Sequence, residues 1–129
     1  MDFREATPVA FINVTERERA LTFYRNILGF ELSSADSYGD FIAMGQALIR
    51  MTVMPGYQPP PYPVCGWEVA DIGAAVALLA GRGVTMTIYE GLGQDEQGIW
   101  TSPENGSKVA FFSDSEGNVL SLSQRWTRP

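Results

Sequence analysis

The stretch VAFINVTERERALTFYRNILG, from Val9 to Gly29, decides the fold because it joins a strand pattern to a helix pattern. Its first six residues are an apolar run, and the remainder places apolar side chains at helical spacing: Ala20, Tyr24, Ile27 and Leu28. Thr15 followed by Glu18 has the form of a capping box, which predicts the start of the helix. Gly29 suits the left-handed residue that ends a helix. The stretch therefore predicts a strand followed by a helix.

The pattern continues and then repeats. Three more apolar runs, separated by turn residues, complete a βαβββ order: Phe30–Ser33, Phe41–Met44 and Ala47–Met54. A second strand and helix follow at Val64–Val69 and 72–83, with Asp71 as a plausible cap. Three further strands complete the second copy: Val84–Tyr89, Lys108–Ser113 and Val119–Gln124. Val14 and Val69 occupy equivalent places 55 residues apart, which indicates an internal duplication.

The repeat predicts an α+β fold of two tandem βαβββ modules that form a curved, partly closed mixed sheet with a central trough. We place the first module at 1–54, a Pro-rich linker at 55–63 and the second module at 64–129, within one structural domain. Five of the eight prolines fall in the linker, which favours a stiff, extended chain. The same run also allows a P-x-x-P ligand for another domain.

The charge and hydropathy of the chain exclude two classes of binding partner. The net charge is −6 with only nine Lys and Arg, so we expect no nucleic-acid partner. No apolar stretch approaches the roughly 20 residues that span a bilayer, so we expect no membrane span. The first residues lack the layout of a secretion signal, and we expect cytoplasmic residence.

The chain has no histidine, which removes Ser-His-Asp and Cys-His catalysis and the commonest ligand of Zn, Ni, Cu and Fe sites. The single cysteine, Cys65, is expected to be a buried structural thiol rather than a nucleophile. Asp114 and Glu116 flank a polar turn that is expected to be a solvated hairpin, with cation binding as the alternative.

Two stretches resemble the vicinal oxygen chelate superfamily, which includes glyoxalase I, extradiol dioxygenases, fosfomycin-resistance proteins and bleomycin-binding proteins. FINVTERERALTFYRNILGFEL, from Phe11 to Leu32, is similar to the first module of that family. FFSDSEGNVLSLSQ, from Phe111 to Gln124, is similar to its closing signature, with Ser115 in place of the usual proline. The resemblance implies a homodimer and a metal-dependent active site in catalytic members.

In those members a divalent metal is held by His, Gln or Glu from the first and last strands of each module. Carried over by position, the resemblance implies that these places are taken here by Val9, Thr52, Val64 and Ser121. Valine has no donor atom, and hydroxyls alone bind transition metals poorly. We therefore predict no metal and no cofactor.

Strand parity selects the side chains that face the trough. The predicted ligand-binding set contains Phe11, Asn13, Phe41, Arg50, Thr52, Glu68, Trp100 and Ser121. Several members have a plainer interpretation. Phe11 and Phe41 are also consistent with ordinary core, Arg50 with an ion pair to Glu68, and Ser121 with simple exposure to solvent. Trp100, in a long polar loop, either closes on a ligand as part of a lid or packs on a partner subunit.

Three functions fit these observations. The first is a metal-free module that binds a flat, partly apolar small molecule, with the acidic surface favouring cationic ligands. The second is a glyoxalase-type lyase, isomerase or dioxygenase that uses Glu68, with a raised pKa in an apolar trough, or Tyr89 in acid–base chemistry. The third is a structural dimer with a vestigial pocket.

Overall fold

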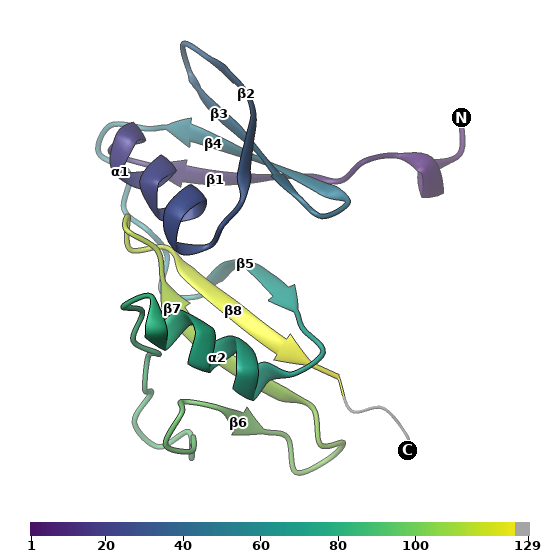
Figure 1. Cartoon of the computed structure of the whole chain (residues 1–129), viewed down its shortest axis with the longest axis vertical. Helices are drawn as coiled ribbons and strands as arrows, with labels where there is room; N and C mark the ends of the chain where they lie inside the picture. The colour runs from purple at the N-terminus through teal and green to yellow at the C-terminus, as the bar shows by residue number, and fades with distance from the viewer. Residues whose placement is uncertain (126–129) are drawn as a thin grey trace. The chain divides into compact units, whose positions relative to one another are not determined.

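The computed structural model describes residues 1–125, and the contacts within it divide the chain into two units between Pro59 and Pro60. Each unit contains one mixed four-stranded sheet and one main helix (Figure 1). The order of elements in each unit is strand, helix and three strands. The predicted α+β class and the tandem βαβββ modules are confirmed.

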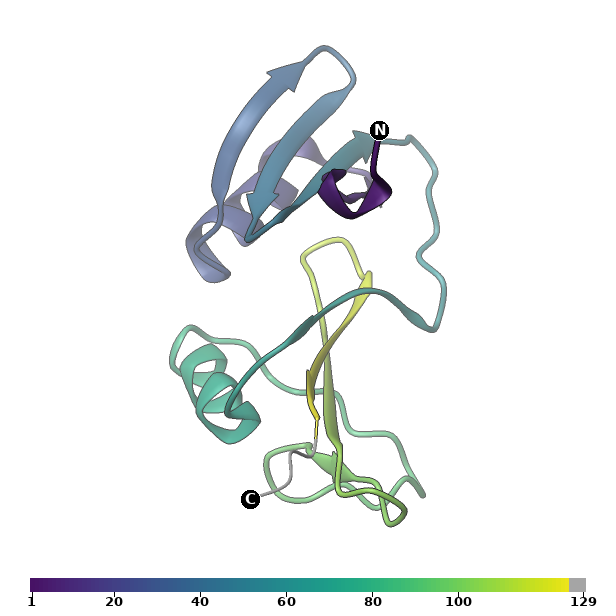
Figure 2. The same cartoon turned by 90° about the vertical axis from the view of Figure 1, so that its right-hand side faces the viewer.

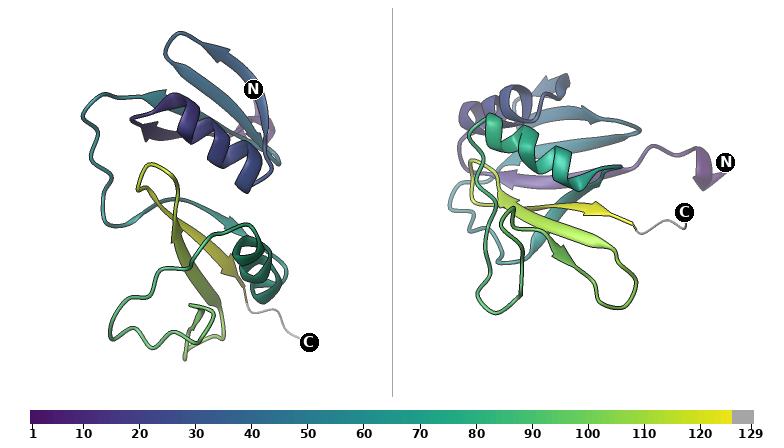
Figure 3. Two further views of the ribbon diagram at one scale, coloured as in Figure 1. Left: turned by 60° about the vertical axis from the view of Figure 1, so that its left-hand side comes forward. Right: turned by 60° about the horizontal axis from the view of Figure 1, so that its bottom comes forward.

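The first module forms a sheet in the order β1-β4-β3-β2, with β1 parallel to β4 and the other neighbours antiparallel. The helix and the π-helical segment that continues it lie along one face of this sheet (Figures 1 and 3). The elements are a 3-10 turn at Phe3–Glu5, β1 Val9–Val14, α1 Arg17–Thr22, the π-helical segment Phe23–Ile27, β2 Glu31–Asp36, β3 Gly39–Met44 and β4 Ala47–Val53.

The second module forms a sheet in the order β5-β8-β7-β6, and α2 packs on β7 and β8 (Figure 2). Its elements are β5 Pro63–Glu68, α2 Ile72–Gly81, β6 Trp100–Thr101, β7 Lys108–Ser113 and β8 Val119–Gln124. The sequence predicted one continuous, partly closed sheet, whereas the strands form two separate open sheets. The reason is the pairing, because the first strand of each module bonds to the last strand of the same module.

Alternation along the strands builds the core of the first module. In β1 the side chains of Ile12 and Val14 are buried, as parity predicts, although Ala10 at the start of the strand is exposed. The neighbouring strands bury Ile42, Ile49 and Met51, and the helical segment buries Ala20 and Tyr24. Each fully buried side chain of this size contributes about 1.5–3 kcal/mol relative to exposure.

The core of the second module lies between its sheet and α2. The helix buries Ile72, Val76 and Leu79, and the sheet buries Ala110, Phe112, Leu120 and Leu122. The Trp67 ring stacks on Phe112 with centroids 6.4 Å apart, which places Trp67 on the helix face as predicted. The face of each sheet that meets its helix therefore forms the core, and the opposite face is available for a binding site.

Of the three residue signals predicted to start or end a helix, two are confirmed. Asp71 caps α2 by accepting a hydrogen bond from the Ala74 backbone N–H at 3.0 Å, and Gly29 has a φ of 80°. The capping box at Thr15 is wrong, because α1 begins at Arg17 and its N-cap, Glu16, makes no side-chain capping bond. Within residues 1–125, no helix is long and apolar enough to cross a membrane.

The strand predicted at Val84–Tyr89 is also wrong. Only one backbone bond ties this segment to β7, from the Thr87 N–H to the Phe111 carbonyl at 2.8 Å. The Gln94 side chain takes the place of further sheet bonds, since its amide donates to the Thr87 carbonyl at 2.9 Å and accepts from the Tyr89 N–H at 2.7 Å. The edge of the sheet is instead β6, which pairs with Val109 and Lys108.

Candidate functional site

The face of the first sheet opposite its helix brings together five predicted ligand-binding residues. Arg50 lies between Phe11 and Phe41 in the register of three adjacent strands. Thr52, two residues further along β4, lies opposite Asn13. Because side chains two residues apart share a face of a strand, the two rows form one surface of aromatic and polar groups.

Phe11 is the most exposed large side chain on this surface. It is 69% exposed, whereas its neighbour Ile12 on the other face is only 1% exposed. The interpretation of Phe11 as ordinary core is therefore wrong. Phe41 is half-buried, and one side of its ring is occupied by the Arg50 guanidinium, whose central carbon lies 4.7 Å from the ring centroid. Phe11 thus offers an aromatic surface that Arg50 does not cover in this arrangement.

Arg50 is anchored within its own module. Its Nη2 donates to Asp36 Oδ1 at 2.8 Å, so the predicted alternative partner, Glu68, is replaced by Asp36. The Arg50 side chain is only 12% exposed. Among the described residues its Nη1 is buried and has no hydrogen-bond acceptor. A buried donor without a partner costs about 1–3 kcal/mol, so this atom favours an added acceptor.

Asp36 holds the arginine from a tight turn at the tip of the β2–β3 hairpin. Its Oδ1 accepts from the backbone N–H groups of Tyr38 at 2.8 Å and Gly39 at 3.1 Å, as well as from Arg50. The hydrogen bond from Arg50, followed by that from Tyr38, holds the pKa of Asp36 below its ordinary value of 3.8. Asp36 is therefore ionised at neutral pH and fixes one side of the guanidinium.

The second sheet carries the other three predicted residues on its face away from α2. Glu68, Ser123, Val109 and Trp100 are aligned across the four strands, and Gly66, Ser121 and Phe111 form the next row. Glu68, Trp100 and Ser121 therefore share a face, as strand parity predicts. A Cβ added at Gly66 would overlap the hydroxyl of Ser121, so the serine side chain lies over the glycine.

Glu68 does not have the environment of a general base. Its carboxylate is paired with Arg125, with 2.9 Å between Oε2 and Nη2 and a second contact between Oε1 and Nε. This pairing lowers the pKa of Glu68 below its ordinary value of 4.5. The sequence predicted a raised pKa from an apolar trough; the direction is the opposite because Glu68 is partly exposed and has a cationic partner.

The long polar segment before β7 is tied down by its own side chains. Asp95 Oδ1 accepts from the backbone N–H groups of Gln97 and Ile99, both at 2.9 Å. The Gln94 amide also donates to the Gly98 carbonyl at 2.9 Å. Trp100 follows this loop directly and is half-buried in β6. These bonds favour a fixed loop over a lid that moves freely.

The side chains at the four positions that the family resemblance assigns to metal ligands have few donor atoms. Val9 and Val64 offer hydrocarbon side chains, and Thr52 and Ser121 offer neutral hydroxyls. Within residues 1–125 there is also no group of three or more Asp, Glu or Cys side chains placed to hold a metal ion. Transition metals prefer imidazole, thiolate and carboxylate ligands, so these four side chains do not fit the family metal.

The polar turn between β7 and β8 is built differently from the predicted solvated hairpin, because Asp114, Glu116 and Asn118 are all buried. Asp114 Oδ1 accepts from the backbone N–H groups of Glu116 and Asn118, each at 2.8 Å. The carboxylate thus stabilises the turn itself.

Cys65 is half-buried, and burial raises the pKa of its thiol, which agrees with a structural role.

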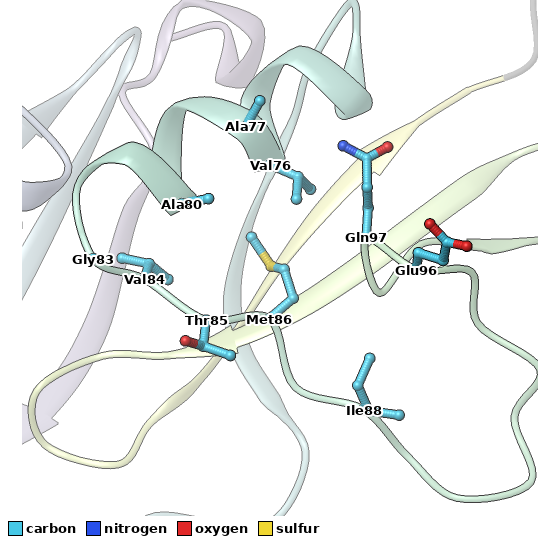
Figure 4. Close-up of a pocket in the computed structure, with 10 residues that line it drawn as sticks. All are labelled: Val76, Ala77, Ala80, Gly83, Val84, Thr85, Met86, Ile88, Glu96 and Gln97. Atoms are coloured by element: carbon cyan, nitrogen blue, oxygen red, sulfur yellow. The ribbon is translucent and has the colours of Figure 1, made fainter.

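Sequence reasoning missed a groove beside α2 in the second module. It has a volume of about 480 Å³, and Figure 4 shows the residues that line it. The residues are Val76, Ala77, Ala80, Gly83, Val84, Thr85, Met86, Ile88, Glu96 and Gln97. The short side chains of Ala77 and Ala80, one helical turn apart, were the available signal. The groove is lined mainly by apolar groups, and nothing in it selects a ligand.

Solved structures share the fold with this chain. A glyoxalase/bleomycin resistance protein/dioxygenase from Alicyclobacillus acidocaldarius superposes with a TM-score of 0.75 at 15% identity, covering 98% of this chain and 96% of the other. The fosfomycin resistance protein FosX from Listeria monocytogenes gives 0.71 at 12% identity, with coverage of 95% and 94%. TnmS3, an antibiotic binding protein from Streptomyces sp. CB03234, gives 0.68 at 22% identity, with coverage of 95% and 97%.

At these identities the structural likeness establishes the fold alone, and no curated protein matches the sequence significantly. The family comparison goes further. The sequence model of the glyoxalase/bleomycin resistance protein/dioxygenase superfamily matches residues 7–129. Because that match spans nearly the whole chain, this protein belongs to the glyoxalase/bleomycin resistance protein/dioxygenase superfamily.

Proposed function

We propose that this protein binds a flat, partly apolar small molecule without a metal ion, on the sheet face that carries Phe11, Arg50 and Phe41. The observation that carries the proposal is the exposure of Phe11 in register with a shielded arginine. Covering an exposed phenylalanine ring stabilises a complex by about 1.5–3 kcal/mol. A planar ligand placed over this row gains that contact and also reaches polar groups, which is the usual composition of a small-molecule site.

The side chains at the family metal positions support binding over conversion. Val9 and Val64 contribute contact area but no ligand atom, and Ser121 contributes a hydroxyl held over Gly66. Of these residues, Val9 shares the face of β1 that carries Phe11, where a hydrocarbon side chain suits the wall of a binding surface. The presence of an antibiotic binding protein, TnmS3, among the structural neighbours agrees with this function.

The enzyme alternative needs an acid–base residue; Glu68 was the first candidate and Tyr89, whose ring packs edge-on against Phe111, the second. Proton abstraction is most efficient when the pKa of the base lies near the working pH. The ion pair with Arg125 moves the pKa of Glu68 in the other direction. The geometry of Glu68 therefore favours a role in holding the end of β5 to the chain after β8.

A thermal-shift screen with uncharged planar aromatic compounds tests the proposal. A ligand at 100 times its dissociation constant stabilises the folded state by about 2.7 kcal/mol. Phe11→Ser should abolish the shift, while Phe3→Ser, the same change at an exposed residue outside the sheet, should leave it intact. Metal analysis of protein purified without chelator should find far less than one transition ion per chain. Stoichiometric Zn or Ni, or a shift that survives Phe11→Ser, contradicts the proposal.

Two expectations accompany this function. By family resemblance we expect a homodimer, which sedimentation velocity will test directly. We also expect the protein in the cytoplasm, which cell fractionation will test. Neither expectation is needed for the ligand-binding proposal, because its residues lie on one sheet of one module.

A further inference from the structure

We infer that the ligand carries an oxyanion conjugated to its aromatic ring, such as a carboxylate, and that Arg50 Nη1 is the donor that selects it. This inference rests on the proposed function and names the chemical class of the ligand. It depends on three features of the sheet face. Arg50 Nη1 is a hydrogen-bond donor without an acceptor, Asp36 fixes Nη2 of the same guanidinium, and Phe11 lies beside Arg50 in the register of the strands.

The guanidinium has one terminal nitrogen, Nη2, in a hydrogen bond and one, Nη1, without an acceptor. Nη2 is bonded to Asp36 Oδ1 at 2.8 Å, and the ring of Phe41 lies against the guanidinium plane at 4.7 Å. Both contacts restrict the side chain to one orientation. Nη1 is buried in that orientation and has no acceptor among residues 1–125. An acceptor placed there forms a charge-assisted hydrogen bond that water does not weaken.

Asp36 does not satisfy the arginine fully. The same oxygen that accepts from Nη2 also accepts from the backbone N–H groups of Tyr38 and Gly39. The aspartate is half exposed, so solvent screens its charge more than that of the shielded guanidinium. The local field at Nη1 is therefore positive and favours an anionic oxygen over a cationic or purely apolar group.

The net negative charge of the chain attracts cations at long range, but it does not determine which ligand group binds at Arg50 Nη1. At physiological ionic strength the field of exposed charges decays over about 8 Å, whereas a hydrogen bond to Nη1 acts at about 3 Å. The net charge of −6 thus affects the rate of encounter, and Arg50 decides which ligand stays. The inference thus differs from the expectation of cationic ligands that follows from composition alone.

Phe11 supplies the second half of the recognition. Arg50 has Phe11 on one side in the register and Phe41 on the other, and the Phe41 ring is already in contact with the guanidinium. The ligand therefore approaches from the side of Phe11. In the complex that we infer, its ring stacks on Phe11, and the side chains that bury Nη1 move aside to admit an oxygen attached to that ring.

The test measures the affinities of 2-naphthoate and 2-naphthamide by isothermal titration calorimetry. The two probes share ring and shape, and only the first carries an oxyanion. For the wild-type protein we expect naphthoate to bind about 10- to 100-fold more tightly, the range of a charge-assisted hydrogen bond. Arg50→Met should remove that preference, and Arg50→Lys should keep only part of it, because the ammonium lacks the fixed fork.

Arg25→Met is the matched control, since it removes the same charge from an exposed arginine on the π-helical segment. It should leave the preference for naphthoate unchanged. Equal affinities of both probes for the wild-type protein overturn the inference while leaving the proposed function intact. Binding of neither probe, together with a failed screen of uncharged compounds, overturns both. If Arg50→Met folds poorly, Arg50→Lys still tests the role of Arg50, and a preference for naphthoate that Arg50→Lys keeps in full overturns the inference.

Discussion

Gly39 is a residue at which one added methyl group disturbs both the fold and the candidate site. It begins β3, pairs with Thr52 of β4 and is buried. A Cβ added there would lie 2.9 Å from the carbonyl carbon of Met51 and 3.2 Å from Thr52 Cα, and it would overlap the Met51 carbonyl oxygen. All three atoms belong to the backbone, so no side-chain rotation relieves the contact.

The cost of Gly39→Ala follows from that geometry. Overpacking a well-packed site costs about 1–3 kcal/mol, and a backbone obstacle places this variant at the upper end, about 3 kcal/mol. For a chain of this size that loss lowers the melting temperature by about 10 °C. The variant should also bind naphthoate less tightly, because the N–H of Gly39 helps to hold Asp36, which holds Arg50.

The assay is urea denaturation followed by far-UV circular dichroism. Tryptophan fluorescence alone is unsuitable, since all three tryptophans lie after Pro60 and Gly39 lies before it. Gly81→Ala is the matched control. Gly81 is the last residue of α2, has nothing within 4 Å of an added Cβ and has no positive φ, so alanine there should stabilise by about 0.5–1 kcal/mol. A stability of Gly39→Ala within about 0.5 kcal/mol of wild type would refute the argument, since that is the range of neutral surface changes.

Three further outcomes are expected. Phe112→Ala should lower the free energy of unfolding by about 3–5 kcal/mol in urea denaturation followed by tryptophan fluorescence, to which Trp67 contributes, because the Phe112 ring is fully buried. Asp71→Ala should cost about 1 kcal/mol through loss of the α2 cap, and Asp71→Ser should restore most of it; equal stability of the two variants contradicts the cap. The pKa of Asp36 is lowered on folding, so the stabilisation of the folded state by its carboxylate is complete above pH 3.8 and is lost as the pH falls through the lowered native value. Asp36→Asn should therefore flatten the acid limb of a curve of unfolding free energy against pH. It should leave the slope of that curve between about pH 6 and 8 unchanged.

The sequence predicted those elements in which one periodicity dominates. Val9–Val14, Lys108–Ser113 and Val119–Gln124 have the predicted bounds, because each run is apolar or alternates apolar and polar residues and is bordered by polar turn residues. Val84–Tyr89 has an equally good strand pattern. It failed because the Gln94 side chain takes two of its backbone groups, and a side-chain competitor seven residues away leaves no trace in periodicity.

The candidate site was predictable to the level of strand faces and no further. Parity placed Phe11, Arg50 and Phe41 on one side of the first sheet, and the register aligns them. The partner of Arg50 was not predictable, since Asp36 reaches it through a β2–β3 pairing whose register shifts between Leu32 and Ser34. Such an irregularity changes which side chains meet without changing the pattern of apolar residues.

Under the proposed function, an arginine close to a family metal position gives one physical reason why the face would hold a ligand rather than convert it. Family resemblance places a metal ligand at Thr52, and Arg50 lies two residues earlier on the same face of β4, about 7 Å away along the strand. A guanidinium at that distance still supplies positive charge and directional donors for an oxygen of the ligand. Unlike a divalent ion, it does not lower the pKa of a bound water or polarise a carbonyl as a Lewis acid. The proposed function therefore assigns to Arg50 the recognition of an oxygen on the ligand and does not assign to it the bond-breaking chemistry that a divalent ion supplies.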